Sequence, residues 1–140
     1  MTFRFLLQSR WADMDALHHV NNVRYLEYAQ EARIAFFVRA VGLDPDNRSP
    51  VVVVRQEIDY LRPLVHRDGQ IAVDVTVTHL GNRSFTLAQT VRDPGPDGST
   101  YARVLTVLVG FDPATEFSRP LEEAERAGLT ALLAAADAPA

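Results

Sequence analysis

The chain has 140 residues, of which 47% are hydrophobic, enough for one compact domain and too few for two of ordinary size. Its formal net charge of -4 gives no basic field for a nucleic-acid backbone, so nucleic acid is not an expected partner. The absence of cysteine excludes disulfide frameworks, thiolate zinc sites and cysteine nucleophiles. We therefore expect a single domain over residues 1–140.

The N-terminal stretch MTFRFLLQSRW does not look like a signal peptide, because it lacks a basic region, a long apolar stretch and a small-residue cleavage site. Nothing later in the sequence approaches the roughly 20 apolar residues that a membrane span needs. We expect a soluble, cytoplasmic protein with no membrane partner.

Apolar residues alternate over residues 3–10, which predicts a short first strand. A polar loop, WADMDALHHVNN, follows. Over residues 22–41 the apolar positions recur at helical spacing, which predicts the one long helix of the chain. Asn21 or Asn22 can supply its N-cap oxygen, and Gly42 stands where a C-cap belongs.

Four β-rich segments follow, which we place at residues 51–61, 70–80, 83–92 and 100–111. The first of them begins with four consecutive valines, a β-branched run too short for a helix. The last segment of the chain, from Pro120 to Ala134, has helical composition.

Short turns separate the last three strands, which predicts that they are antiparallel neighbours. Gly81 and Asn82 form a two-residue gap of hairpin type, and PGPDG lies at the centre of the next connection. One long helix with five strands predicts an α+β domain, in which an antiparallel sheet packs against that helix.

The densest set of reactive side chains lies between Trp11 and Asn22, where the chain carries two carboxylates, two imidazoles and two amides. This loop leads directly into a helix start, whose unpaired N–H groups and positive dipole end can polarise a carbonyl group. A nearby carboxylate could then act as a general base or a nucleophile. Alternatively, the same residues only turn the chain and cap the helix.

Other chemistries find less support. Asp13, Asp15, His18 and His19 are ligand types for a metal, but adjacent histidines on an extended loop point in different directions, so we expect no metal and no other cofactor. Ser84 lies in GNRSFTL, which is not the G-x-S-x-G elbow of a serine hydrolase. No Gly-rich phosphate loop is present, which argues against nucleotide hydrolysis and Rossmann-type redox chemistry.

Four segments in order along the chain resemble the 4-hydroxybenzoyl-CoA thioesterase-like family of hot-dog proteins. They are DMDALHHVNNVRYLEYAQEAR, IDYLRPLVHRDG, HLGNRSFTLAQ and VLVGFDPATEFSRPL. The likeness is strongest to the branch of bacterial long-chain acyl-CoA thioesterases. It implies a hot-dog fold, in which a curved antiparallel five-stranded sheet wraps around one long helix, and homodimers that often assemble into homotetramers with active sites at the dimer interface.

The resemblance also implies roles for individual residues. The catalytic loop carboxylate of the family falls on Asp15, and the backbone N–H at the helix start, near Asn22, would polarise the thioester carbonyl. His19 belongs to the HVNN signature, where it either holds the loop by hydrogen bonds or moves protons. Arg83 and Ser84 lie on the hairpin that faces coenzyme A in the family, and the Arg83 guanidinium would bind phosphate.

Some positions depart from the family pattern. Many relatives carry glycine where His18 stands, and one branch carries histidine or tyrosine in place of Asn22, so only the backbone of Asn22 enters the hypothesis. Arg62 and Arg67 are further candidates for binding the phosphates. Tyr25 and Tyr28 could line an acyl tunnel, although aromatic residues on a buried helix are more often core.

The leading hypothesis is hydrolysis of a fatty or aromatic acyl-CoA to the free acid and coenzyme A, with Asp15 as nucleophile or general base. Asp13 is instead expected to shape the loop. The alternatives are an acyl-carrier-protein thioesterase, a hot-dog dehydratase, and a non-catalytic module that binds acyl-CoA or a partner protein.

Overall fold

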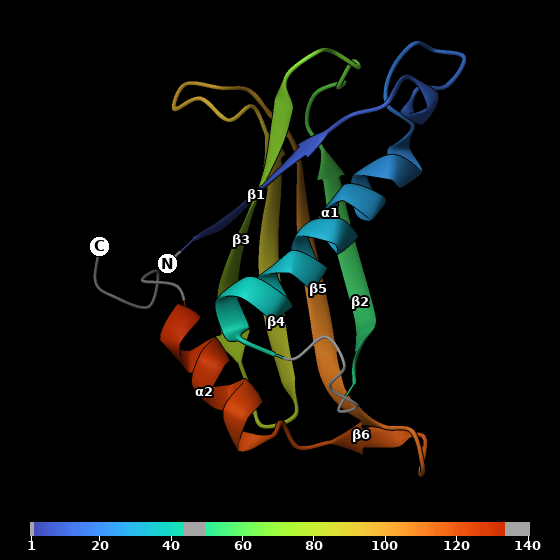
Figure 1. Cartoon of the computed structure of the whole chain (residues 1–140). Coiled ribbons are helices and arrows are strands. Elements are labelled where there is room, and N and C mark those ends of the chain that lie inside the picture. Colours follow the sequence, from blue (N-terminus) through green and yellow to red (C-terminus); the bar gives the residue numbers. More distant parts are fainter. Residues whose placement is uncertain (1, 44–49, 134–140) are drawn as a thin grey trace.

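A curved antiparallel sheet wraps around the long helix α1 (Asn22–Phe36), which lies across one face of the strands (Figure 1). The computed structural model describes residues 2–43 and 50–133. The strands are β1 (Phe3–Gln8), β2 (Val51–Tyr60), β3 (Gln70–Leu80), β4 (Ser84–Arg92), β5 (Thr100–Asp112) and β6 (Phe117–Arg119). Their order across the sheet is β1-β3-β4-β5-β2, with β6 paired to β5, and all pairings are antiparallel. The expected sheet around one long helix is confirmed.

The expected number of strands is wrong, because the sheet has six strands and not five. The additional strand β6 has only three residues, too few for an alternating pattern to appear in the sequence. It folds back on the end of β5 after a turn, so tertiary pairing and not local propensity makes it a strand. The hairpin between β3 and β4 also differs slightly, since three residues, Gly81 to Arg83, separate the two strands.

Both predicted helices are present, but their ends differ from the predicted ones. The last residues expected in α1 form a π-helical segment, η2 (Phe37–Val41), and Gly42 follows with a φ of 81°, as the expected C-cap requires. The C-terminal helix α2 spans Glu123–Leu132, while Ala134 lies outside the described residues. Within residues 2–43 and 50–133, no helix combines the length and apolar character needed to cross a membrane.

One face of α1 is buried against the sheet. Its buried apolar side chains recur at helical spacing: Tyr25, Tyr28, Ala29, Ala32 and Phe36. They meet valine, leucine and phenylalanine side chains that alternate along β3, β4 and β5. The helix is therefore held by an apolar core that extends over the centre of the sheet.

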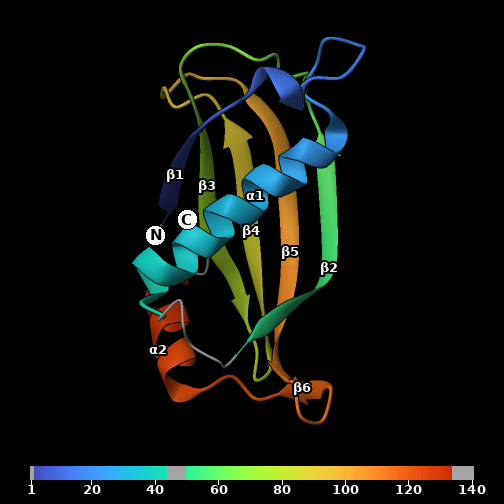
Figure 2. The same cartoon turned by 45° about the vertical axis from the view of Figure 1, so that its right-hand side comes forward.

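Strand β2 lies at the open edge of the sheet and pairs only with β5 (Figure 2). The side chains of Val53 and Val54 are 39% and 56% exposed, and the register shifts between Val53 and Arg55. The four consecutive valines of the sequence therefore lie at the start of an edge strand. An open edge of this kind is able to pair with another strand unless the protein protects it.

The short C-terminal elements are joined by a buried ion pair. Arg119 of β6 donates from Nη1 to Oε1 of Glu125 on α2 at 2.8 Å, and the Glu125 side chain is only 2% exposed. The Arg119 guanidinium also donates to the carbonyl of Pro50 at 3.0 Å, just before β2. One guanidinium thus ties β6, α2 and the start of β2 together.

Replacing Arg119 with methionine should strongly destabilise the fold, because it leaves the buried Glu125 carboxylate without its cation. We expect Arg119→Met to lower the free energy of unfolding by about 3–5 kcal/mol, measured by urea denaturation. The matched control is Arg4→Met, which breaks the more exposed pair with Asp74 and should cost less than about 1 kcal/mol. Equal losses in the two variants would contradict this assignment.

Candidate active site

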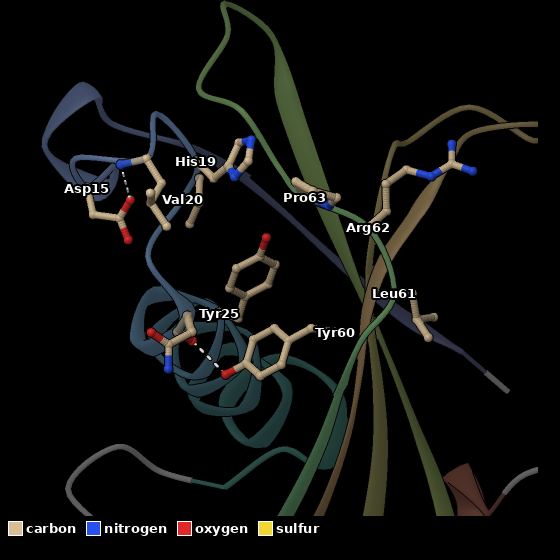
Figure 3. Close-up of a pocket in the computed structure, with 10 residues that line it drawn as sticks. Asp15, His19, Val20, Tyr25, Tyr60, Leu61, Arg62 and Pro63 are labelled. Atoms are coloured by element: carbon tan, nitrogen blue, oxygen red, sulfur yellow. Dashed lines mark hydrogen bonds between the residues drawn. The ribbon is translucent and has the colours of Figure 1, made fainter.

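An open cavity of about 340 Å³ lies where the loop between β1 and α1 meets the residues that follow β2 (Figure 3). Its lining comes from the loop (Asp15, Leu17, His19, Val20), from the start of α1 (Asn22, Tyr25) and from the end of β2 and beyond (Tyr60, Leu61, Arg62, Pro63). The structure therefore brings together the three residues for which the sequence suggested catalysis, Asp15, His19 and Asn22.

The loop folds back on itself before the helix begins. The Asp15 N–H donates to the carbonyl of His19 at 3.1 Å, and the His18 N–H donates to the carbonyl of Asp15 at 3.0 Å. His18 closes this turn with a φ of 60°, in the left-handed region that favours glycine. The turn explains why a glycine suits position 18, and it places the Asp15 carboxylate next to the helix start.

Asp13 is buried and its carboxylate has partners within the protein. Its Oδ2 accepts hydrogen bonds from the Tyr28 hydroxyl at 2.5 Å and from the Arg10 N–H at 3.0 Å. Burial raises the pKa of the Tyr28 phenol, and its hydrogen bond to Asp13 raises that pKa further. These contacts fit the loop-shaping role expected for Asp13.

Asp15 has a different environment, although it is only two residues away. Its side chain is exposed and faces the cavity. The carboxylate is oriented by two hydrogen bonds, which it accepts from the Leu17 N–H at 2.9 Å and from the Asn21 side-chain amide at 3.2 Å. It is held in place yet remains accessible to a ligand.

The helix start supplies a free donor beside this carboxylate. Asn21 is the N-cap, and its side-chain oxygen accepts the Val23 N–H at 3.0 Å. The Arg24 N–H donates to the carbonyl of Asn21 at 2.9 Å. Among residues 2–43 and 50–133, the N–H of Asn22 finds no acceptor. A free N–H at a helix start favours an anion or a developing negative charge.

The other predicted residues lie in different places. His19 is exposed, and its ring reaches toward Pro63 on the far side of the cavity from the Asp15 carboxylate (Figure 3). Arg83 and Ser84 lie on the β3–β4 hairpin, at the opposite end of the sheet from the loop (Figure 1). The Arg83 guanidinium donates to the carbonyl of Ser118 at 2.7 Å. Within one chain, the structure does not bring Arg83 and Ser84 to the cavity.

The far wall of the cavity is made by Tyr60 to Pro63 together with Tyr25. The sequence suggested a binding role for Tyr25 and Arg62 but not for Tyr60. Tyr25 is buried, and its hydroxyl accepts the Leu64 N–H at 3.1 Å. Burial raises the pKa of the Tyr25 phenol. A signal for Tyr60 did exist in the sequence, because it lies at a strand end two residues before an Arg-Pro pair, and the loops that follow strands often carry functional side chains.

Two other features of the site bear on ligand binding. Arg62 lines the cavity, and its guanidinium donates to the Ser99 hydroxyl at 2.8 Å. Arg67 is instead paired with Asp93 and donates to the Tyr101 hydroxyl. In the described part of the chain, no three histidine, aspartate or glutamate side chains converge as a metal site would need.

Comparison with known proteins decides the family. A family model of the thioesterase-like superfamily matches residues 9–136. The chain belongs to this superfamily. The long-chain acyl-CoA thioesterase FadM of Escherichia coli K12 is 30% identical over 118 residues, 83% of this chain and 88% of FadM. The 1,4-dihydroxy-2-naphthoyl-CoA hydrolase of Rippkaea orientalis is 30% identical over 119 residues, 81% of this chain and 85% of that enzyme.

The chain is also similar to two further proteins. The uncharacterized protein YsmA of Bacillus subtilis is 30% identical over 78 residues, which are about half of its length (52%). A thioesterase from Thermus thermophilus, solved in complex with coenzyme A and Zn, is 35% identical, with a TM-score of 0.77 and 92% of each chain covered. The protein is therefore a thioester hydrolase of the hot-dog fold, and its superfamily supports acyl-CoA thioesterase activity.

His18 offers a test of the loop geometry. A left-handed backbone costs a residue other than glycine about 1–2 kcal/mol, and replacing His18 with glycine would remove this strain. The greater conformational entropy of glycine in the unfolded chain offsets part of that stabilisation. We therefore expect His18→Gly to raise the free energy of unfolding by up to about 1 kcal/mol in urea denaturation. The control His19→Gly should lower it, since His19 has no positive φ. A loss in both variants would rule out the strained turn.

Proposed function

We propose that the protein hydrolyses the thioester of a fatty or aromatic acyl-CoA, with Asp15 as nucleophile or general base and the Asn22 N–H polarising the carbonyl. The observation that carries this proposal is that Asp15, with its accessible carboxylate, and Asn22, with its unpaired N–H at the helix start, line the same cavity. A carbonyl group bound between them would meet a base or nucleophile on one side and a donor for its oxygen on the other.

Two reaction sequences fit this arrangement. As a general base, Asp15 takes a proton from water while the water oxygen attacks the thioester carbon, and the oxyanion forms next to the Asn22 N–H. The C–S bond then breaks, and the leaving coenzyme A thiolate takes up a proton. As a nucleophile, the carboxylate itself attacks and expels the thiolate, and water hydrolyses the resulting mixed anhydride. Both routes release a free acid and coenzyme A.

In this proposal Asn22 contributes its backbone N–H, and His19 stabilises the loop. The Asn22 side chain is not required, because the backbone N–H provides the polarising donor. The His19 carbonyl accepts the Asp15 N–H and so helps to fix the loop. Its ring lies at the cavity without a hydrogen bond to Asp15, so holding the loop is the role we assign first.

The names of the relatives support an acyl-CoA substrate and leave both acyl classes open. FadM is named for long-chain acyl-CoA, which is aliphatic, and the Rippkaea enzyme for an aromatic acyl-CoA. The cavity has tyrosine, leucine, valine and proline side chains beside its polar groups, so it presents an apolar surface to either class.

We further propose that the working protein is a homodimer or homotetramer. Strand β2 has an open, apolar edge that a second copy could pair with. Around the cavity, Leu17, Tyr60 and Leu61 are 75%, 46% and 47% exposed. Oxyanion stabilisation is much stronger where water is excluded, and a second copy would supply the missing cover.

Such an assembly also gives Arg83 and Ser84 a role. Within one chain they lie at the opposite end of the sheet from Asp15, so they could bind coenzyme A only at the site of another copy. Arg83 is exposed, and a guanidinium binds phosphate as a planar fork. Arg62 is the candidate from the same chain, because it already lines the cavity.

The alternatives differ in ways that one assay separates. A non-catalytic module would have no use for an oriented, accessible carboxylate beside a free helix N–H. An acyl-carrier-protein thioesterase would need a surface for an acidic carrier, whereas this chain has 14 basic and 18 acidic residues. Free-thiol release from a panel of acyl-CoA and acyl-carrier substrates tells these functions apart.

Asp15→Asn tests the mechanism. The substitution keeps the size of the side chain and an oxygen for the Leu17 N–H but removes the charge. We expect kcat for the best acyl-CoA to fall by about 10²–10⁴-fold, while folding and assembly persist. Asp13→Asn is the matched control. It should lower thermal stability, because the Asp13 carboxylate is buried and accepts two hydrogen bonds, but its effect on kcat should be milder. An Asp15→Asn protein within a few-fold of the original rate would refute the mechanism.

Arg83→Ala tests the shared site. We expect KM for acyl-CoA to rise by about tenfold or more, the effect of losing one charged hydrogen bond, with little change for a short thioester that lacks the nucleotide. The control Arg4→Ala removes an arginine paired with Asp74 and should leave both KM values unchanged.

Sedimentation equilibrium should give a mass at least twice 15.6 kDa, and a stable 15.6 kDa species at micromolar concentration would argue against the shared site.

A further inference from the structure

The segment from Tyr60 to Leu64 holds the start of α1 and the loop before it through three hydrogen bonds. The Tyr60 hydroxyl donates to the carbonyl of Asn22 at 2.8 Å (Figure 3). The carbonyl of Leu64 accepts the Val20 N–H at 2.7 Å, and the Leu64 N–H donates to the Tyr25 hydroxyl at 3.1 Å. These bonds link residues about 40 positions apart in the sequence, at the wall of the proposed catalytic cavity.

The bond from Tyr60 acts on the peptide group between Asn22 and Val23. The carbonyl oxygen of this group accepts the Tyr60 hydroxyl, and its N–H donates to the N-cap side chain of Asn21 at 3.0 Å. One peptide plane is therefore held from both of its edges. The free N–H of Asn22 belongs to the preceding peptide plane, which is joined to this one through the φ and ψ bonds of Asn22. Because a helical residue keeps both angles in a narrow range, fixing this plane restricts the direction in which that N–H points.

The ring of Tyr60 is itself held in position. It contacts the Tyr25 ring edge to face, with 5.2 Å between centroids and 87° between planes. Tyr25 is 3% exposed, so it forms a rigid support for the more exposed Tyr60. An aromatic pair of this geometry favours one orientation of the two rings, which keeps the Tyr60 hydroxyl directed at the helix.

We propose that Tyr60 is a positioning residue for thioester hydrolysis, which holds the first turn of α1 so that the Asn22 N–H stays directed at the carbonyl oxygen of the substrate. This inference rests on the proposed function. Tyr60 acts through the backbone of Asn22 and transfers no proton. Positioned donors contribute to catalysis because they need no reorganisation when the oxyanion forms. A loosened helix turn should therefore slow the reaction without weakening binding of the substrate.

The test is Tyr60→Phe, which removes one oxygen atom and keeps the ring. We expect kcat for acyl-CoA to fall about threefold to tenfold, as for loss of one ordinary hydrogen bond, with KM within about twofold. In amide NMR spectra, the resonances of Asn22 and Val23 should shift, and the Val23 N–H, which donates to the Asn21 side chain, should exchange its hydrogen faster. The matched control is Tyr101→Phe, which removes a hydroxyl bonded to Asp93 and Arg67 away from the cavity lining, and should keep kcat unchanged.

Three results would overturn the inference: an unchanged kcat in Tyr60→Phe, an equal loss of kcat in Tyr101→Phe, or a rise in KM at constant kcat. The last result would mean that Tyr60 binds the substrate directly. If the unaltered protein hydrolysed no acyl-CoA, the proposed function would fail instead. In that case unchanged amide resonances at Asn22 and Val23 in Tyr60→Phe would separately disprove the hold on the helix start.

Discussion

The first turn of α1 has backbone N–H groups without helical acceptors, and much of the structure around the cavity satisfies or uses this constraint. The Asn21 side chain and carbonyl satisfy the N–H groups of Val23 and Arg24. Among the residues that the structure describes, the N–H of Asn22 has no acceptor, and we propose that it serves a ligand. Because a positive helix end favours negative charge, the same physics that requires a cap also provides a site for an oxyanion.

The loop before the helix separates two chemically identical side chains by their surroundings. Asp13 is buried, and its Oδ2 accepts two hydrogen bonds, so it serves the fold. Asp15 is exposed and is only oriented by its neighbours, so it remains available for chemistry. Asp13 ends the short 3-10 turn Trp11–Asp13, whereas Asp15 begins the exposed turn that His18 closes, and this difference in position accompanies the difference in burial.

The open edge at β2 connects assembly with the site. Tyr60, which ends this strand, reaches the carbonyl of Asn22, so a second copy paired along β2 would restrain the strand that holds the helix start. In the assembly that we propose, Arg83 would serve the cavity of another copy, because within one chain its hairpin does not reach the cavity. Fold, assembly and chemistry then depend on one strand.

The sequence by itself determined the long helix and the strands of the central sheet and narrowed the helix cap to Asn21 or Asn22, because periodicity and capping are local properties. It also marked the loop that carries Asp13 and Asp15, since reactive residues adjoining a helix start form a local pattern, and the family resemblance singled out Asp15 within it. The tertiary structure decided the rest. Strand β6 exists only by pairing with β5, and the wall at Tyr60 faces the loop only because the sheet curves around α1. Such long-range contacts depend on how the chain packs, which no local pattern encodes.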